Sequence, residues 1–157
     1  MDTAFELSQV HEAEKHKFTL ENKKLLWHSS RFSTPIAALS HGLKIAPEQA
    51  PDSCFLFGKG IYFTDMASKA LGSCYVFNNT ALIFLCEVAL GNIKKMKKFD
   101  CNAFDNYNKY DSALGCGFVF PNPNESKYID EIEIPLGKPM ISKEKVTKKY
   151  NLRKFLS

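Results

Sequence analysis

Two short apolar runs, each bordered by small or polar residues, constrain the fold of this chain more than any other feature. The first, Leu25-Leu26-Trp27, ends on His28 and is followed by two serines. The second, Ile61-Tyr62-Phe63, is opened by Gly58-Lys59-Gly60. Apolar runs of this length are typical of strands. Two strands that end beside residues of little bulk can form the floor and wall of a narrow slot, which would suit a flat polar ring.

Helix signals follow each of these runs. Thr34 is a predicted N-cap, Pro35 suits the first helical position, and Gly42 is a C-terminal stop. Asp65 is predicted to cap a second helix that begins at Met66. The sequence therefore predicts short helices, each placed directly after a strand.

The other elements are short strands and irregular loops. Apolar periodicity predicts strands at Ala4 to Val10, Lys24 to His28, Gly60 to Phe63, Thr80 to Leu90 and Ile129 to Ile134. Charged or Asn-, Gly- and Pro-rich segments predict loops at 12–22, 46–53 and 101–124, and an exposed basic cluster at 94–98. Many short strands with a few helices indicate an α+β domain with mostly antiparallel sheets. No repeat or linker divides the chain, so we expect one domain over residues 1–157.

Composition excludes several classes of protein. The chain has 157 residues, 45% of them hydrophobic and 24% charged, which fits a globular domain able to bury a core. Its longest apolar run, Ala81 to Cys86, is too short to span a bilayer. The N-terminus lacks the basic-then-apolar pattern of a secretory signal. We expect an intracellular protein, in the nucleus or cytoplasm.

The five cysteines support that expectation. They are odd in number and lack CxxC spacing, which predicts free thiols and no zinc site.

Several motifs together resemble a known family. The segments LLWHSSR, GLKIAP, FGKGIYFTDMASK and CEVALGN occur in an order and at spacings similar to the catalytic domain of the poly(ADP-ribose) polymerases, and DEIEIPLGK resembles a later segment. The similarity covers Phe5 to Lys138. It implies an ADP-ribosyltransferase fold, with two packed, mostly antiparallel sheets and a few short helices, without the family's helical regulatory region. The implied substrate is NAD+, cleaved between nicotinamide and ribose, with no metal.

The resemblance also implies roles for individual residues. His28 would donate a hydrogen bond to the adenosine-side ribose, and Tyr62 would stack on the nicotinamide side of the pocket. Ser29 replaces a glycine whose backbone grips the carboxamide. The implied NAD-binding residues are His28, Ser29, Ser30, Arg31, Gly60, Tyr62, Phe63, Lys69, Ser73 and Tyr75. A core histidine, a core tyrosine and a surface ion pair of Arg31 are the alternative interpretations.

Two positions depart from the family pattern. Ala70 stands in place of a serine that bonds the carboxamide, and Ser73 in place of a second stacking tyrosine. Tyr75 could substitute for that tyrosine if the helix end shifts. Losing one hydrogen bond costs about 0.5–1.5 kcal/mol, so the pocket would be weakened but not abolished.

The family's catalytic glutamate has no evident counterpart. In the family it lies on a late strand in an E-Y setting, and no E-Y pair follows Leu136. Counting back without gaps from Asn151 places Ile141 at this position, whereas a shift of three residues places Glu144 there. Glu144 is the only acidic residue after Glu133, which makes it the candidate catalytic carboxylate. The alternative is an exposed glutamate between two lysines.

Three functions are compatible with these features. The first is an active ADP-ribosyltransferase with His28, Tyr62 and Glu144 as its catalytic set, adding single units to a protein or nucleic-acid acceptor. The second is a non-catalytic module that binds NAD or ADP-ribose. The third is a transferase of the Arg-Ser-Glu type, suggested by Arg31 and the pair Glu131 and Glu133, although His28 and Tyr62 favour the other subclass. We expect a monomer.

The net charge of +4 is concentrated near the C-terminus. Residues 138–157 carry seven Lys or Arg against one Glu, a local charge of +6. This segment is either a solvated surface or a site of weak contact with a polyanion such as nucleic acid or ADP-ribose polymer.

Overall fold

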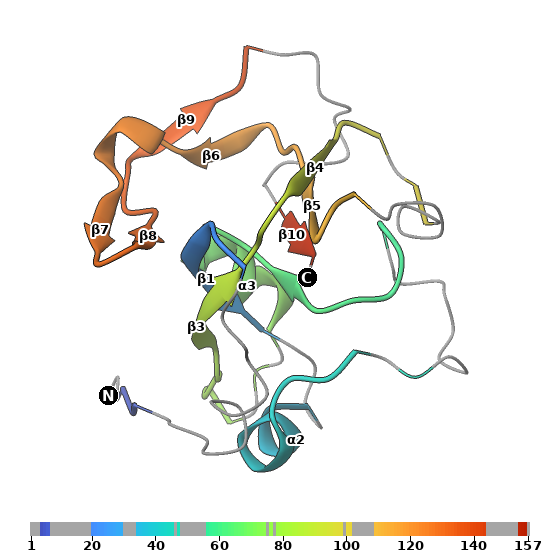
Figure 1. The fold of residues 1–157 in the computed structure, drawn as a ribbon. Helices are drawn as coiled ribbons and strands as arrows, with labels where there is room; N and C mark the ends of the chain where they lie inside the picture. Colours follow the sequence, from blue (N-terminus) through green and yellow to red (C-terminus); the bar gives the residue numbers. More distant parts are fainter. Residues whose placement is uncertain are drawn as a thin grey trace.

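β1 (Lys23–His28) lies between two other strands of the first sheet and connects it to the second (Figure 1). The computed structural model describes residues 4–6, 20–29, 34–45, 47, 56–74, 76, 78–98, 100–101, 109–143 and 154–156. β1 pairs antiparallel with β3 (Phe84–Ala89) along its whole length and parallel with β8 (Ile132–Ile134) at its start. With β7 (Lys127–Ile129) these strands form sheet 1, in the order β3-β1-β8-β7.

Sheet 2 is assembled from segments far apart in the sequence. Its order is β2-β10-β5-β4, from β2 (Tyr62–Phe63), β10 (Lys154–Leu156), β5 (Ser112–Gly115) and β4 (Ile93–Met96). β10 pairs antiparallel with both β2 and β5, and β4 runs parallel to β5. The last strand in the sequence therefore lies inside the sheet.

The remaining elements are small. β6 (Val119–Pro121) and β9 (Pro139–Ile141) form a two-stranded ribbon, and a 3-10 turn, Pro123–Glu125, follows β6. α2 (Thr34–His41) lies at the bottom of Figure 1, whereas α3 (Ala67–Ser73) lies behind β1 and contacts it.

Two clusters of buried side chains hold these sheets together. The larger joins sheets 1 and 2 and contains Leu26, Phe63, Val88, Leu90 and Leu114. Leu26 lies two residues before His28, so the face of β1 that carries the histidine is the buried one. The smaller cluster, Phe57, Met96 and Ala113, packs under sheet 2 and includes part of Tyr62.

The predicted α+β class with a few short helices is confirmed, and so are β1 and α2, although Thr34, the predicted N-cap, is the first residue of the helix. Gly42 follows α2 with φ +76° and its N–H bonds to the carbonyl of Ala38, as expected of a helix stop. The prediction of two sheets is incomplete, because β6 and β9 form a third. Pro121 lies opposite Pro139, and since proline has no N–H the ladder stops there and stays small.

The predicted loop over 101–124 is wrong where it covers β5 and β6. β5 reads SALG, which has weak strand propensity, yet all four residues are buried between β4 and β10. Tertiary packing, not propensity, makes this segment a strand. Residues 102–108 lie outside the described ranges.

Other strand predictions need adjustment. Ala4–Glu6 form no strand, and Phe5 is 80% exposed; residues 7–10 lie outside the described ranges. The predicted strand at 129–134 is a hairpin, β7 and β8, because Asp130 turns the chain at φ +52°. The strand predicted at 80–90 occupies only 84–89.

The basic cluster was predicted as exposed, and Lys95, Lys97 and Lys98 are exposed. Lys94 and Lys95, however, belong to β4, and Lys94 is half-buried. β4 is an edge strand of sheet 2. Lysines on an edge disfavour pairing with another chain, which gives this cluster a structural explanation.

Cysteine chemistry follows the prediction where the structure describes it. Cys74, Cys86, Cys101 and Cys116 are free thiols, and Cys54 lies outside the described residues. None of the helices in the described ranges has the length and apolar character to cross a membrane.

Candidate functional site

The ends of β1 and β2 meet at a two-residue bridge. Trp27 and Thr64 exchange both backbone hydrogen bonds, each with an N···O distance of 2.8 Å. This bridge places the end of a strand from sheet 1 beside the end of a strand from sheet 2. α3 begins three residues after Thr64 and covers the junction.

A hollow of about 70 Å³ lies between β1, β2 and α3, and we call it the slot. Its lining residues are Trp27, Ser29, Tyr62, Phe63, Thr64, Lys69, Ala70 and Ser73. Five of these belong to the predicted NAD-binding set: Ser29, Tyr62, Phe63, Lys69 and Ser73. The two apolar runs from which the prediction began thus border one cavity.

His28 lies between Trp27 and Ser29, two lining residues of the slot, but does not line the slot itself, and its imidazole is held in one orientation. Nδ1 is 2.8 Å from the carbonyl oxygen of Tyr62, and because a carbonyl only accepts, the proton must be on Nδ1. Burial lowers the pKa of His28 below its usual 6.5, an effect that the bond to Tyr62 partly opposes. The ring is therefore neutral, and Nε2 carries a lone pair.

Nε2 of His28 is buried and has no hydrogen-bond partner within the described structure. The ring is fixed between Phe63 and Phe84, with centroid distances of 5.5 and 6.2 Å. A neutral ring of this tautomer can accept a hydrogen bond at Nε2 but cannot donate one there. The geometry thus favours His28 as an acceptor, the reverse of the role that the family resemblance implied.

Tyr62 supports the glycine turn that precedes its strand. Its hydroxyl donates to the carbonyl of Gly58 at 2.6 Å and accepts from the backbone N–H of Phe57 at 3.1 Å. Gly58 has φ +92°, a conformation that suits glycine. Burial raises the pKa of the Tyr62 phenol, while bonds from the backbone of Phe57 and Leu56 oppose the rise. Tyr62 is therefore both a wall of the slot and a packed core residue.

The α3 wall is held to β1 by a serine. Ser29 Oγ donates to the carbonyl of Ala70 at 2.7 Å, and Ser73 Oγ donates to the carbonyl of Lys69 at 3.2 Å. Helix C-termini leave carbonyls without helical partners, and these hydroxyls bind two of the carbonyls of α3. The side chain at position 29 thus has a structural role that glycine could not fill.

The prediction that Asp65 caps α3 is wrong. The N-cap is Met66, which makes no side-chain cap bond, and Asp65 is only 5% exposed. Asp65 lines a second hollow of about 60 Å³, which we call the acidic hollow, together with Lys24, Pro121, Pro123, Ser126, Glu133 and Pro135. The bridge between Trp27 and Thr64 explains why Asp65 does not cap α3, because it extends the strand conformation up to the residue before Asp65.

The model of the poly(ADP-ribose) polymerase catalytic domain matches residues 2–156 of this chain. The chain belongs to this family. It is 43% identical over 145 residues to a poly(ADP-ribose) polymerase of Sarcophaga peregrina, covering 87% of this chain and 14% of that protein. Identity to poly(ADP-ribose) polymerase 2 is 39% over 141 residues in Arabidopsis thaliana and 38% over 135 residues in Homo sapiens. These alignments cover 87% and 85% of this chain but 22% and 23% of those relatives.

The resemblance expected from the motifs is thereby confirmed, and the chain spans a quarter or less of the length of these curated relatives. The described lining of the slot carries little charge. Among the described residues that line it, Lys69 is the only lysine or arginine, and none is a carboxylate.

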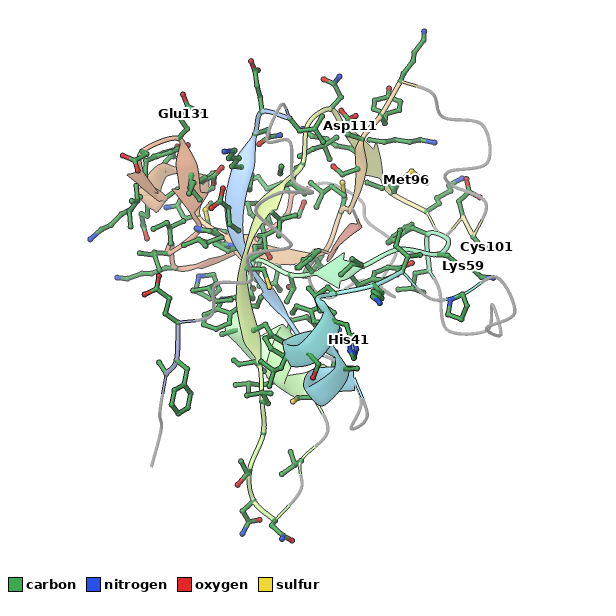
Figure 2. All side chains as sticks on the ribbon, turned by 60° about the horizontal axis from the view of Figure 1, so that its bottom comes forward. His41, Lys59, Met96, Cys101, Asp111 and Glu131 are labelled. Carbon is green, nitrogen blue, oxygen red and sulfur yellow. The ribbon has the colours of Figure 1, made fainter. Side chains whose placement is uncertain are left out.

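The predicted carboxylates lie in different places. Glu133 is directed into the acidic hollow, where it binds Lys24 at 2.6 Å and Ser126 Oγ at 2.9 Å. Glu131 is exposed in the turn between β7 and β8, and Figure 2 shows it pointing away from the molecule. Both positions disfavour the Arg-Ser-Glu type of site. Glu144 lies outside the described residues.

Of the remaining predicted binding residues, one lies near the slot and three lie outside the described ranges. Gly60 lies just before β2, in the turn that Tyr62 supports, and does not line the slot. Ser30, Arg31 and Tyr75 lie outside the described ranges. Sequence reasoning missed Trp27 and Thr64 as lining residues, although their places beside His28 and Phe63 on predicted strands were a usable signal.

Proposed function

We propose that this domain binds NAD+ with the nicotinamide ring in the slot and transfers ADP-ribose to an acceptor. The observation that supports this most strongly is the slot itself, which is lined by Trp27, Tyr62 and Phe63. His28, the residue after Trp27, has a neutral ring whose Nε2 is a buried acceptor without a partner in the described structure. A ribose hydroxyl can donate to that atom, and a flat ring can stack on the aromatic wall. The family membership supports the same reaction.

The reaction requires the bond between nicotinamide and ribose to break with its electron pair leaving on nicotinamide. The ribose carbon becomes oxocarbenium-like, the acceptor's nucleophile attacks it, and the acceptor loses a proton. The role of the slot is to hold the ring and ribose in a reactive orientation. Excluding water at the aromatic wall would favour transfer over hydrolysis.

Glu144 is our candidate for the carboxylate that stabilises the cation. The observation in its favour is the position of β10, because Leu156 pairs with Tyr62 and Phe155 with Phe63 at the wall of the slot. Residue 144 belongs to the segment that leads into this strand. In the family, chain elongation depends on the corresponding glutamate in its usual setting, so its absence from that setting favours single-unit transfer over polymer synthesis.

A second function is favoured by one specific observation. The described lining of the slot contains Lys69 and no carboxylate, which suits ring binding better than stabilisation of a cation. The alternative is therefore a catalytically impaired module that binds NAD or ADP-ribose. In either case the acceptor or partner is a protein or nucleic acid, and the basic segment 138–157 could add weak polyanion contact.

One experiment separates the two functions. The purified chain is incubated with NAD+ labelled in the nicotinamide ring and, in a parallel reaction, in the adenylate group. Nicotinamide release with adenylate label on protein supports transfer, whereas saturable NAD+ binding without release supports the binding module. The absence of both would contradict the NAD site. The matched control is His28→Ala, which should abolish release or weaken binding without changing the oligomeric state.

A further inference from the structure

The two walls of the slot differ in kind. β1 and β2 contribute the aromatic side chains of Trp27, Tyr62 and Phe63. The facing wall, α3, contributes Lys69, Ala70 and Ser73, and none of its residues from Ala67 to Ser73 has a ring. Within the described lining, a flat ring in the slot would therefore stack on one face and meet a methyl and a hydroxymethyl group on the other.

The side chains that line the slot near the C-terminal end of α3, Ala70 and Ser73, are also short. Ala70 is only 2% exposed, whereas Leu71 is 50% exposed and Ser73 is exposed. A Cβ added at Gly72 would meet none of the described atoms within 4 Å, so the described surroundings leave space at this end of the helix. The Ser73 hydroxyl bonds to the carbonyl of Lys69, which holds the short side chain against its own helix.

From this asymmetry we propose that the slot accepts flat carboxamide rings with a bulky apolar substituent on the edge that faces Ser73, and that Ser73 sets this tolerance. The substituent extends past the short side chain of Ser73 into solvent. The parent ring stays stacked against the aromatic side chains of β1 and β2. A ring at position 73 would occupy the same passage and exclude the substituent. The inference rests on the proposed function, because it takes the slot as the nicotinamide site.

The test compares a small ring with two enlarged ones by calorimetric titration. The probes are benzamide, biphenyl-3-carboxamide and biphenyl-4-carboxamide. The wild-type chain should bind at least one biphenyl probe within about threefold of benzamide or more tightly, because the added ring needs no displacement of protein atoms. In Ser73→Phe, that biphenyl probe should bind about tenfold or more weakly through steric overlap, while benzamide should bind equally or better through added stacking.

Ser68 provides the matched control. It is an exposed serine of the same helix and does not line the slot, so Ser68→Phe should leave the affinity of every probe unchanged. Thermal melting of each variant checks that it is folded. Ser73→Leu is the second variant if the phenylalanine proves destabilising, and it should also discriminate against the biphenyl probe.

Each other outcome has a definite meaning. Benzamide binding with rejection of both biphenyl probes by the wild type would overturn this inference and leave the proposed function standing. Equal binding of all probes by wild type, Ser73→Phe and Ser73→Leu would remove Ser73 from this role. Failure of benzamide and nicotinamide to bind the wild type would overturn the proposed function and this inference with it.

Discussion

The slot and the acidic hollow are similar in volume, about 70 and 60 Å³, and both are lined by β1, yet their chemistry is opposite. The slot lies at the His28 end and combines aromatic rings with one lysine. The acidic hollow lies at the Lys24 end and holds Asp65 and Glu133, with Glu133 already paired to Lys24. The aromatic rings and the two carboxylates thus lie toward different ends of one strand. If the slot is the NAD+ site that we propose, a carboxylate for transfer would come from a segment other than its described lining.

Tyr62→Ala should produce the largest effect and tests how far the slot depends on the core. Removing a ring packed on Phe57 and Met96 should lower the free energy of unfolding by about 3–5 kcal/mol. Tyr62→Phe keeps the ring and loses the hydrogen bonds of the hydroxyl, which should cost about 1–3 kcal/mol. Urea denaturation measures both. If Tyr62→Ala unfolds like the wild type, the tyrosine is a surface wall and not a shared core residue.

Glu144→Gln tests whether the segment before β10 supplies the missing carboxylate. In preparations that turn over NAD+, this change should lower the rate by about 100-fold with little change in NAD+ affinity, because the charge acts on the transition state. Single-turnover release of nicotinamide measures the rate. Glu131→Gln is the control, since Glu131 is exposed and distant in the hairpin turn, and it should keep the wild-type rate. A fully active Glu144→Gln variant would exclude Glu144 from the site.

Glu133→Gln tests whether the acidic hollow contributes to stability and not to NAD+ binding. Loss of the charge that binds Lys24 and Ser126 should lower the free energy of unfolding by about 1–3 kcal/mol. NAD+ affinity should stay unchanged, because this pair does not border the slot. The matched control is Glu87→Gln, whose partner Lys23 is at 3.6 Å in a more exposed pair, and it should cost about 1 kcal/mol or less. Weaker NAD+ binding by Glu133→Gln would contradict the separation of the two hollows.

The smallest expected effect is the pH dependence that His28 gives to the wild-type protein. Its pKa is lowered in the folded state, so NAD+ affinity should be constant from pH 8 to about 6.5 and fall only at lower pH, when Nε2 gains a proton. The unfolded chain takes up this proton near pH 6.5 and the folded chain does not, so stability should also decrease as the pH falls below that value. In the His28→Asn variant, the parts of the pH dependence of NAD+ affinity and of stability that arise from His28 should be absent. An affinity that increases on acidification would show that His28 acts as a donor.

The slot was predictable to a large extent because its residues follow local signals. Trp27, His28, Tyr62 and Phe63 lie on or just after short apolar runs, and the intervening helix has clear start and stop residues. What the sequence could not show was pairing over long range. β5 has little strand propensity and is defined by its neighbours β4 and β10, and Asp65 resembles a helix cap until the bridge at Thr64 is known.

The roles of individual polar atoms were also beyond sequence reasoning. The tautomer of His28 follows from a carbonyl 34 positions away, and the bond from Ser29 follows from a helix 41 positions away. A resemblance to a family names these residues but does not fix which of them donates. That information requires the local geometry.

The position of β10 has a consequence for how the domain folds. Phe155 pairs with Phe63, 92 positions earlier in the chain, and β2 has its partner in sheet 2 through this strand. Contacts of such separation form slowly, because a long segment must be closed before any of them is gained. During synthesis, β2 cannot join sheet 2 until residues 154–156 have been made. The aromatic wall beside β2 should therefore be among the last parts of the molecule to become ordered.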